Sequence, residues 1–203
     1  MRPTNEALIV IDIQNDFCHN GALAVIDGDA IIAPINDMLS DFSACILTQD
    51  WHPAGHSSFA STHDGRSSFD MIDMPYGHQI LWPDHCIQST DGAAFHNELK
   101  VEKADLIIRK GFRPKIDSYS AFFENDKTTP TGLEGYMRTR GIDTITIVGL
   151  ATDFCVAYSA LDASKLGFKV TVDMNACRSI DLDGSLDAAL FQMHAAGVKL
   201  KHD

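Results

Sequence analysis

The sequence has few basic residues and no long apolar run, and each shortage excludes a class of protein. Lysine and arginine together number 16 against 28 aspartates and glutamates, so the formal net charge is -12. A surface this acidic repels both the phosphate backbone of a nucleic acid and an anionic membrane. No apolar run approaches the roughly 18 residues that a membrane span needs. We therefore expect neither a nucleic acid nor a membrane as a partner.

Cysteine is also scarce, and the 5 cysteines lack the short, even spacing of a disulfide framework. Free thiols of this kind are typical of proteins in a reducing compartment. The first apolar run, residues 7–11, meets Asp12 too early to serve as the apolar region of a signal peptide. These features predict a cytoplasmic protein. A length of 203 residues with 45% hydrophobic residues predicts a single domain over residues 1–203.

Short apolar runs alternate with helical patterns along most of the chain. Runs that are apolar throughout are typical of strands covered on both faces, and strand–helix alternation predicts right-handed crossovers. The sequence thus predicts an α/β fold with a parallel sheet between helices. The helical patterns lie at residues 29–42, 133–140, 154–166 and 186–196. The expected strands are residues 7–13, 44–49, 104–110, 144–150, 168–173 and 196–201.

One long segment does not follow this alternation. Residues 51–95 show little periodicity but are rich in His, Ser, Gly, Asp and aromatic residues. An irregular segment longer than about 15 residues inside a compact domain is usually functional or disordered. The aromatic residues indicate order, so we expect this segment to carry a metal site and to cover a substrate. No glycine-rich phosphate loop follows the first strand, which leaves nucleotide binding without its main support.

Polar side chains stand at the ends of four expected strands: Asp12, Asp50, Lys110 and Cys155. Because sites in parallel sheets form beyond the carboxyl ends of the strands, we expect these side chains at one rim. Each also has a structural explanation, since the aspartates can act as caps, the lysine can be solvated and free cysteine is often a core residue. Taken together, however, these side chains have the composition of a catalytic site. A base for the thiol proton and a cation for the thiolate complete a nucleophilic site around Cys155.

The position of Cys155 is distinctive because an apolar strand has just ended there and a helix is starting. If Thr152 or Asp153 is the N-cap, Cys155 lies in the first helical turn. Unpaired backbone N–H groups and the helix dipole favour a thiolate at such a place. The sequence therefore predicts an environment that favours the ionised form of Cys155.

A second set of side chains has the composition of a metal site. Asp50 and His52 are two residues apart, so both can point the same way from an extended segment, and His85 follows later. Asp, His and His bind a divalent transition metal while keeping positions open, with zinc as our first choice and iron or manganese also compatible. A merely polar, histidine-rich loop is the alternative. His56 is a further possible ligand, and Cys86 is a weaker one because neighbours of a ligand usually point elsewhere.

Several stretches that contain these residues resemble the nicotinamidase/pyrazinamidase family, within the isochorismatase-like cysteine hydrolases. The stretches are 8-LIVIDIQNDFC-18, 21-GALAV-25, 48-TQDWHP-53, 82-WPDHC-86, 109-RKG-111, 117-DSYSAFF-123 and 149-GLATDFCV-156. Together they extend over nearly the whole chain. The resemblance implies a three-layer α/β/α sandwich around a six-stranded, mostly parallel sheet.

The resemblance also implies a role for each candidate residue. The catalytic residues implied are Asp12, Lys110 and Cys155, and the metal ligands are Asp50, His52 and His85. The backbone amides of Ala151 and Cys155 are expected to form an oxyanion hole, after a non-proline cis peptide between Leu150 and Ala151. The substrate ring is expected to lie against Phe17, Trp82 and Tyr119.

The activity that the resemblance implies is hydrolysis of nicotinamide to nicotinate and ammonia in NAD salvage, with pyrazinamide as a second substrate. Three other functions remain open: an N-carbamoyl or ureido amidohydrolase, a metal–water hydrolase in which Cys155 is structural, and a binding protein without activity. The metal ligands count against the first and the complete catalytic set against the last. The oligomeric state stays open, and we expect structural roles for Cys18, Cys45, Cys86 and Cys177.

Overall fold

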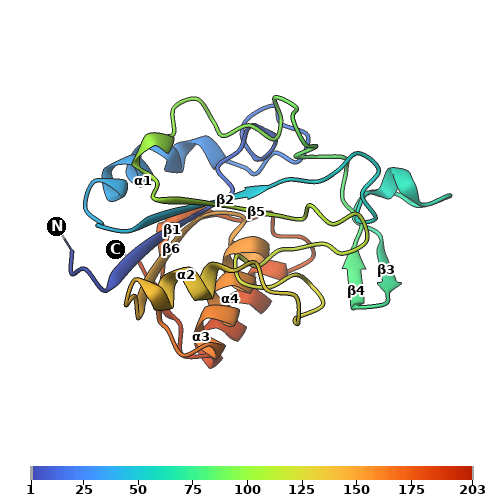
Figure 1. Ribbon diagram of the computed structural model, residues 1–203. Coiled ribbons are helices and arrows are strands. Elements are labelled where there is room, and N and C mark those ends of the chain that lie inside the picture. Colours follow the sequence, from blue (N-terminus) through green and yellow to red (C-terminus); the bar gives the residue numbers. More distant parts are fainter. Residues whose placement is uncertain (1, 203) are drawn as a thin grey trace.

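The computed structural model describes residues 2–202, in which six strands form one sheet (Figure 1). The strands are β1 (Glu6–Ile11), β2 (Cys45–Asp50), β5 (Leu106–Lys110), β6 (Thr144–Leu150), β7 (Lys169–Arg178) and β8 (Lys199–Lys201). Their spatial order is β5-β2-β1-β6-β7-β8, and every neighbouring pair is parallel. All six predicted strands are confirmed, and the sheet is entirely parallel.

Helices cover both faces of this sheet. Helix α1 (Ile32–Leu39) lies on one face, and α2 (Leu133–Thr139), α3 (Ala157–Lys165) and α4 (Ser185–Ala195) lie on the other (Figure 1). The predicted three-layer α/β/α sandwich is therefore confirmed. Short 3-10 turns occur at Asn15–Phe17, Gly28–Ile31, Ala60–Thr62 and Val101–Lys103. No helix within residues 2–202 is long and apolar enough to cross a membrane.

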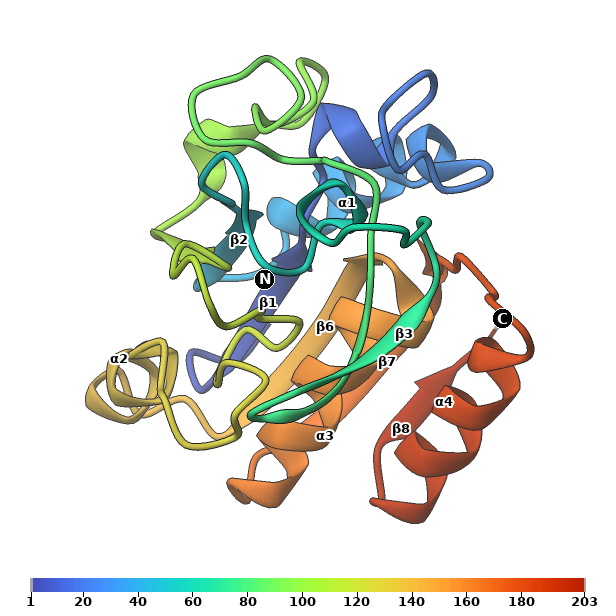
Figure 2. The same cartoon turned by 90° about the vertical axis from the view of Figure 1, so that its right-hand side faces the viewer.

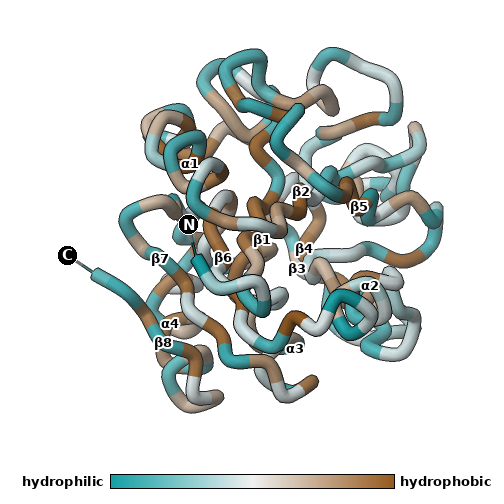
Figure 3. The backbone as a smooth tube through the Cα atoms, turned by 60° about the vertical axis from the view of Figure 1, so that its left-hand side comes forward, coloured by the Kyte–Doolittle hydropathy of each residue, from teal (hydrophilic) through white to brown (hydrophobic). Residues whose placement is uncertain are grey.

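The hydrophobic core follows the central strands. Every residue of β1 after Glu6 and of β6 after Thr144 is buried, because helices cover these strands from both sides. Figure 3 shows the same concentration of hydrophobic residues in the inner strands, with hydrophilic residues dominating the outer loops. The uninterrupted apolar character of these strands in the sequence thus reflects their position in the middle layer.

The order of the strands creates a crevice at one point of the sheet. From β1 the chain proceeds to β2 and β5 on one side, and it then returns to β6 on the other side of β1. Ligands bind in such α/β sheets where the connections diverge, beyond the carboxyl ends of the two strands. Gly149 lets the strands approach here, since a Cβ at this residue (φ 121°) would lie 2.2 Å from the Ile11 carbonyl oxygen.

Residues 51–95 contain a hairpin that the sequence did not predict. Strands β3 (Met71–Met74) and β4 (Gly77–Ile80) pair antiparallel and stand outside the main sheet (Figure 2). They are short and mostly exposed or half-buried, so they contain no apolar run that a sequence pattern can show. The order indicated by the aromatic residues is present at Phe59 and Trp82, which are buried and form a bridge to each other.

Candidate active site

A small cavity lies at the crevice between β1 and β6. Its lining residues are Phe17, Leu23, Asp50, Trp82, His85, Asp117, Tyr119, Ala151, Phe154, Cys155 and Ile180. Most of the predicted site residues are in this wall. The remaining three, Asp12, His52 and Lys110, are buried directly behind it. Trp82 and His85 in the wall come from residues 51–95, so this segment does contribute to the cavity.

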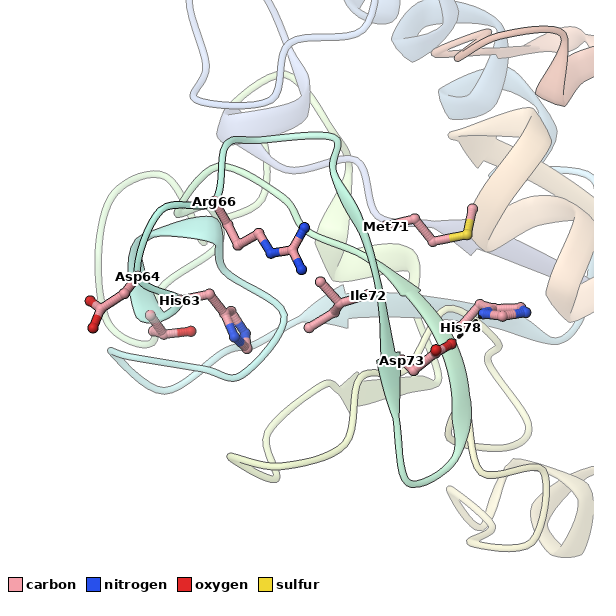
Figure 4. A pocket seen from close by; sticks show the side chains of 8 residues that line it. His63, Asp64, Arg66, Met71, Ile72, Asp73 and His78 are labelled. Carbon is pink, nitrogen blue, oxygen red and sulfur yellow. Dashed lines mark ion pairs between the residues drawn. The ribbon is translucent and has the colours of Figure 1, made fainter.

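A wider hollow lies beside the β3–β4 hairpin (Figure 4). It is lined by Thr62, His63, Asp64, Arg66, Met71, Ile72, Asp73 and His78. The ion pair between His78 and Asp73, at 2.7 Å, is largely exposed to solvent. No predicted site residue lines this hollow, and we therefore place the candidate active site in the smaller cavity.

Cys155 lies in a π-helical turn, Thr152–Val156, which leads into α3. The residue before the turn is Ala151, and no side chain caps the turn. The prediction of Thr152 or Asp153 as N-cap is therefore wrong. The Asp153 carboxylate instead accepts hydrogen bonds from a segment that begins 27 residues later in the chain.

The Leu150–Ala151 peptide bond is cis, as the resemblance implied. Ala151 and Cys155 both line the cavity, at the side of the nucleophile turn. Both residues are thus part of the cavity wall, and the oxyanion-hole role of their amides remains a prediction.

The ammonium group of Lys110 connects the predicted catalytic residues. Its Nζ lies 2.8 Å from Asp12 Oδ2, 3.4 Å from Cys155 Sγ and 3.1 Å from Asp50 Oδ1. Nζ also donates a hydrogen bond to the Ser118 carbonyl oxygen. The lysine is 1% exposed, so its charge is compensated by these buried groups and not by water. Although burial alone would lower the pKa of Lys110, Asp12 and Asp50 raise it well above its usual range, and the lysine stays charged.

The thiol of Cys155 is neutral at rest. Burial raises the pKa of the Cys155 thiol well above its usual range; Lys110 opposes this effect, while Asp12 and Asp50 add to it. The prediction of an environment that favours the ionised thiol is therefore wrong for the resting protein, because burial and two carboxylates outweigh the lysine and the start of the helix. The thiolate forms only if a neighbouring base takes the proton.

Asp12 is placed to be that base. Burial raises the pKa of Asp12, while Lys110 opposes the rise. The Thr48 hydroxyl donates to Asp12 Oδ1 at 2.6 Å, and the Asp12 amide donates back to the Thr48 oxygen at 3.2 Å. This reciprocal pair of hydrogen bonds holds Asp12 at a left-handed φ of 50°. The other carboxylate oxygen, Oδ2, faces Lys110. A hydrogen bond between Cys155 and Asp12 contributes to the raised pKa of the thiol.

The predicted metal ligands converge on one point. Asp50 Oδ2 lies 2.9 Å from His52 Nε2 and 3.4 Å from His85 Nε2. The Nδ1 atoms of the histidines face backbone carbonyl oxygens, of Gly111 at 2.9 Å and of Pro83 at 2.8 Å. A carbonyl only accepts, so each Nδ1 donates to it, and each ring turns its Nε2 toward Asp50. One carboxylate oxygen and two such nitrogens fit a divalent transition metal.

Gly111 makes this geometry possible. Its φ of 67° is in the left-handed region, and a Cβ there would lie 2.5 Å from His52 Cε1 and 3.0 Å from Asp50 Oδ1. Only glycine lets the backbone approach closely enough to offer its carbonyl to His52. The glycine of the 109-RKG-111 stretch thus serves the metal ligands, while the lysine beside it serves the thiol.

His56 lies behind His52, with the ring centroids 4.4 Å apart. Its Nε2 donates to the Arg113 carbonyl oxygen at 2.8 Å, and its Nδ1 is 2.8 Å from the Ser58 hydroxyl. Both nitrogens are therefore engaged away from Asp50. His56 belongs instead to a second group of possible ligands, with His52 and Asp117. Among the residues that the structure describes, Cys86 belongs to no such group.

A different group of possible ligands, Cys18, Asp29 and His96, lies outside the cavity. Burial and a hydrogen bond to Asp29 raise the pKa of Cys18 to about 12. The His19 amide donates to Asp29, and the Glu98 amide donates to His96 Nδ1, so the other ring nitrogen of His96 carries the proton. The bonds of Asp29 thus link it to Cys18 and His19, while His96 bonds within its own loop.

Sequence reasoning missed four residues of the cavity wall: Leu23, Asp117, Phe154 and Ile180. Asp117 is 2% exposed, and its Oδ1 lies 3.9 Å from His52 Nε2. It opens the 117-DSYSAFF-123 stretch, and Leu23 and Phe154 also lie in stretches singled out above, so a signal was present for these three. Ile180 belongs to no such stretch, and only the fold brings it to the cavity.

The isochorismatase domain model matches residues 6–201 of the chain. The chain belongs to the isochorismatase family. It is 54% identical to a nicotinamidase of Acinetobacter baylyi, over 96% of this chain and 91% of that protein. Among solved structures, it is similar to an Acinetobacter baumanii nicotinamidase/pyrazinamidase (TM-score 0.97, 55% identity, 98% of this chain and 97% of the other). It is also similar to a Pyrococcus horikoshii pyrazinamidase in complex with zinc (TM-score 0.78, 35% identity, 98% and 99%).

These isochorismatase-family similarities extend over at least 91% of each relative and not over an isolated motif. The relatives are named nicotinamidase or pyrazinamidase. In this chain, the predicted nucleophile Cys155 and the predicted metal ligands Asp50 and His85 line the same cavity. The stretches that carried the resemblance in the sequence lie around this one cavity.

Proposed function

We propose that this protein is a nicotinamidase, which hydrolyses nicotinamide to nicotinate and ammonia and also accepts pyrazinamide. The observation that carries the proposal is the convergence of two sets of side chains on one buried cavity. Cys155 is at one side, and the Asp50 and His85 pair is in the same wall. An N-carbamoyl amidohydrolase needs the cysteine set, but its reaction does not need the metal ligands.

We assign Asp50, His52 and His85 as ligands of one divalent metal ion, with zinc as the first choice. When bound, the metal would dock the ring nitrogen of the substrate as a Lewis acid. Zinc in the Pyrococcus horikoshii pyrazinamidase supports this choice. The donor set is equally compatible with iron or manganese.

Aromatic side chains of the wall would hold the pyridine ring. The Trp82 indole N–H donates to the Tyr119 hydroxyl at 3.0 Å, and the Phe154 ring meets Trp82 edge-on at 4.9 Å between centroids. Phe17 lies against His85 with 5.5 Å between the rings. Such fixed aromatic walls exclude water and orient a flat ring, which places the carboxamide over Cys155.

The chemistry then uses the cysteine set. Asp12 takes the Cys155 proton, and the sulfur attacks the carboxamide carbon to form a C–S bond. The amides of Ala151 and Cys155 donate hydrogen bonds to the oxyanion. Asp12 returns the proton to the leaving nitrogen, the C–N bond breaks, and ammonia departs. Water then attacks the thioester, giving its proton to Asp12, and nicotinate leaves as Cys155 is protonated again.

Throughout these steps, Lys110 has an electrostatic role. Its ammonium group lies between the carboxylate of Asp12 and the sulfur of Cys155, at 2.8 and 3.4 Å. The proton transfer moves negative charge from one of these groups to the other. Because the lysine contacts both, it stabilises the charge before and after the transfer.

The decisive experiment measures ammonia release from nicotinamide before and after removal of the metal with a strong chelator. We expect release by the metal-loaded protein, a large loss after chelation, and recovery when zinc is added. Release that persists after a demonstrated loss of metal would remove the metal from substrate docking. No release from the loaded protein would overturn the proposed substrate and direct the assay to carbamoyl and ureido amides.

Replacing Thr48 with valine should shift the pH dependence of this reaction. The Thr48 hydrogen bond lowers the pKa of Asp12, so the pKa should rise when the hydroxyl is removed. The reaction needs ionised Asp12, which is present above its pKa and lost below it. The acidic limb of the kcat/KM profile should therefore move to higher pH. Thr146→Val, the same change at another buried position of the sheet, should leave the profile in place.

A further inference from the structure

The turn that carries Cys155 contains a buried carboxylate that has no part in the chemistry above. Asp153 is 4% exposed and is absent from the cavity wall. Its Oδ1 accepts the Ile180 amide at 3.0 Å, and its Oδ2 accepts the Asp181 amide at 2.8 Å. The Ser185 hydroxyl also donates to Oδ2. All three donors come from residues 180–185, which connect β7 to α4.

These contacts explain how a buried charge is tolerated. Within residues 2–202, Asp153 forms no ion pair with a lysine, arginine or histidine, so hydrogen-bond donors must compensate its charge. Ser185 is the first residue of α4, an 11-residue helix preceded by Gly184, which has no side chain to offer as a cap. The carboxylate therefore lies at the positive end of that helix, where a negative charge is favoured.

The segment that Asp153 holds has a backbone conformation that local preference does not favour. Asp181, Asp183 and Gly184 have φ values of 55°, 49° and 82°. Left-handed backbone is unfavourable for residues other than glycine and persists where surrounding contacts enforce it. The bonds to Asp153 are such contacts, since they fix two successive backbone amides, those of Ile180 and Asp181.

The hydrogen bonds of Asp153 connect two segments that each contribute residues to the cavity wall. Phe154 and Cys155 directly follow Asp153, and all of Phe154, Cys155 and Ile180 line the cavity. A change in the distance between the π-helical turn and residues 180–185 would therefore move the nucleophile and the wall relative to each other. A displacement of about 1 Å in a reacting group costs roughly 100-fold in rate.

We propose that Asp153 is a positioning residue: its carboxylate clamps residues 180–185 to the nucleophile turn and so sets the orientation of Cys155 and the place of Ile180. The residue acts through these neighbours and does not contact the substrate. The inference rests on the proposed function for its effect on turnover, but its effect on the thiol can be measured without any substrate.

The test compares Asp153→Asn with Asp162→Asn. The first variant keeps the shape of the side chain but replaces one accepting oxygen with an NH2 group, which faces donors. Asp162 is also a buried aspartate, but it lies on α3 and pairs with Lys127. In each variant we would measure kcat and KM for nicotinamide. We would also measure the rate at which iodoacetamide alkylates Cys155 across pH, by mass spectrometry of the peptide that contains it.

For Asp153→Asn we expect a loss of roughly 100-fold in kcat/KM, together with a changed rate and pH profile of Cys155 alkylation, at temperatures where the variant is folded. Asp162→Asn should stay within about twofold of the unmodified protein in both measurements. A normal alkylation profile and normal kcat in a folded Asp153→Asn variant, with only a lower Tm, would reduce Asp153 to a structural role and overturn the proposal.

Ser185→Ala keeps the test decisive if Asp153→Asn does not fold. This variant removes one of the three donors and leaves the carboxylate in place, so a smaller change in the same direction is expected in both measurements. An unchanged alkylation profile in Ser185→Ala would then overturn the clamp. Absence of nicotinamide turnover in the unmodified protein would instead contradict the proposed function, and the alkylation measurement would still decide the role of Asp153.

Discussion

Replacing Cys155 with alanine should abolish ammonia release from nicotinamide, with a loss of about 10⁴-fold or more in kcat. Among the described residues of the cavity wall, the sulfur is the one nucleophile that has a base and a cation beside it. The metal ligands do not contact the sulfur directly, so the metal content per chain should stay at the level of the unmodified protein. Ammonia release and elemental analysis of the purified variant measure the two quantities.

Cys45→Ser is a matched control for this variant. Cys45 is also a buried cysteine, but it lies at the start of β2, and its thiol donates to the Leu39 carbonyl oxygen, a bond that serine can replace. The control should retain activity. Turnover that survives in Cys155→Ala would favour a hydrolase in which metal-bound water is the nucleophile and Cys155 is structural. Loss of metal from Cys155→Ala would contradict the separation of the two sets.

Replacing His85 with alanine should empty the metal site. The variant loses one of three converging ligand atoms, while Asp50 and His52 keep their own contacts. Loss of an outer-shell partner typically lowers metal affinity about 10–100-fold, and loss of a ligand should exceed that range. Zinc affinity in the absence of substrate, measured by competition with a chromophoric chelator, tests the site independently of activity.

The activity of His85→Ala should fall together with its metal occupancy. Cys155 should remain reactive toward iodoacetamide, because Lys110 and Asp12 stay in place beside the sulfur. His63→Ala is the control, since His63 lies outside the cavity and bonds the Ser57 carbonyl oxygen. Full zinc affinity in His85→Ala would exclude His85 as a ligand and would make the second group of His52, His56 and Asp117 the site to test.

The sheet is the part of the structure that the sequence predicted best. Strands such as β1 and β6 are apolar throughout because both of their faces are covered, and this pattern is local and visible. The β3–β4 hairpin was not visible, because strands of four residues with mainly exposed or half-buried side chains carry no such pattern. Its formation depends on cross-strand pairing, which a sequence pattern of this length does not reveal.

The ionisation of Cys155 is likewise a feature that the sequence pattern did not predict correctly. From sequence, the position of Cys155 at a helix start favours a thiolate. In the structure the sulfur is buried, and the carboxylates of Asp12 and Asp50 lie close enough to raise its pKa. Burial and the distances between charges from different strands determine this pKa, and neither can be obtained from the order of residues along one strand.

The sequence by itself determined the α/β architecture, the residue types of the catalytic and metal sets, and the strand ends at which they stand, because these depend on local apolar patterns and on chemistry that each side chain brings. Only the tertiary structure decided that the two sets share one cavity, that His56 bonds to Ser58 and to the Arg113 carbonyl oxygen, and that Asp153 binds residues 180–185 instead of capping its own turn. These features depend on contacts between segments far apart in the chain, which form only when the strands cross over and the crevice between β1 and β6 brings their ends together.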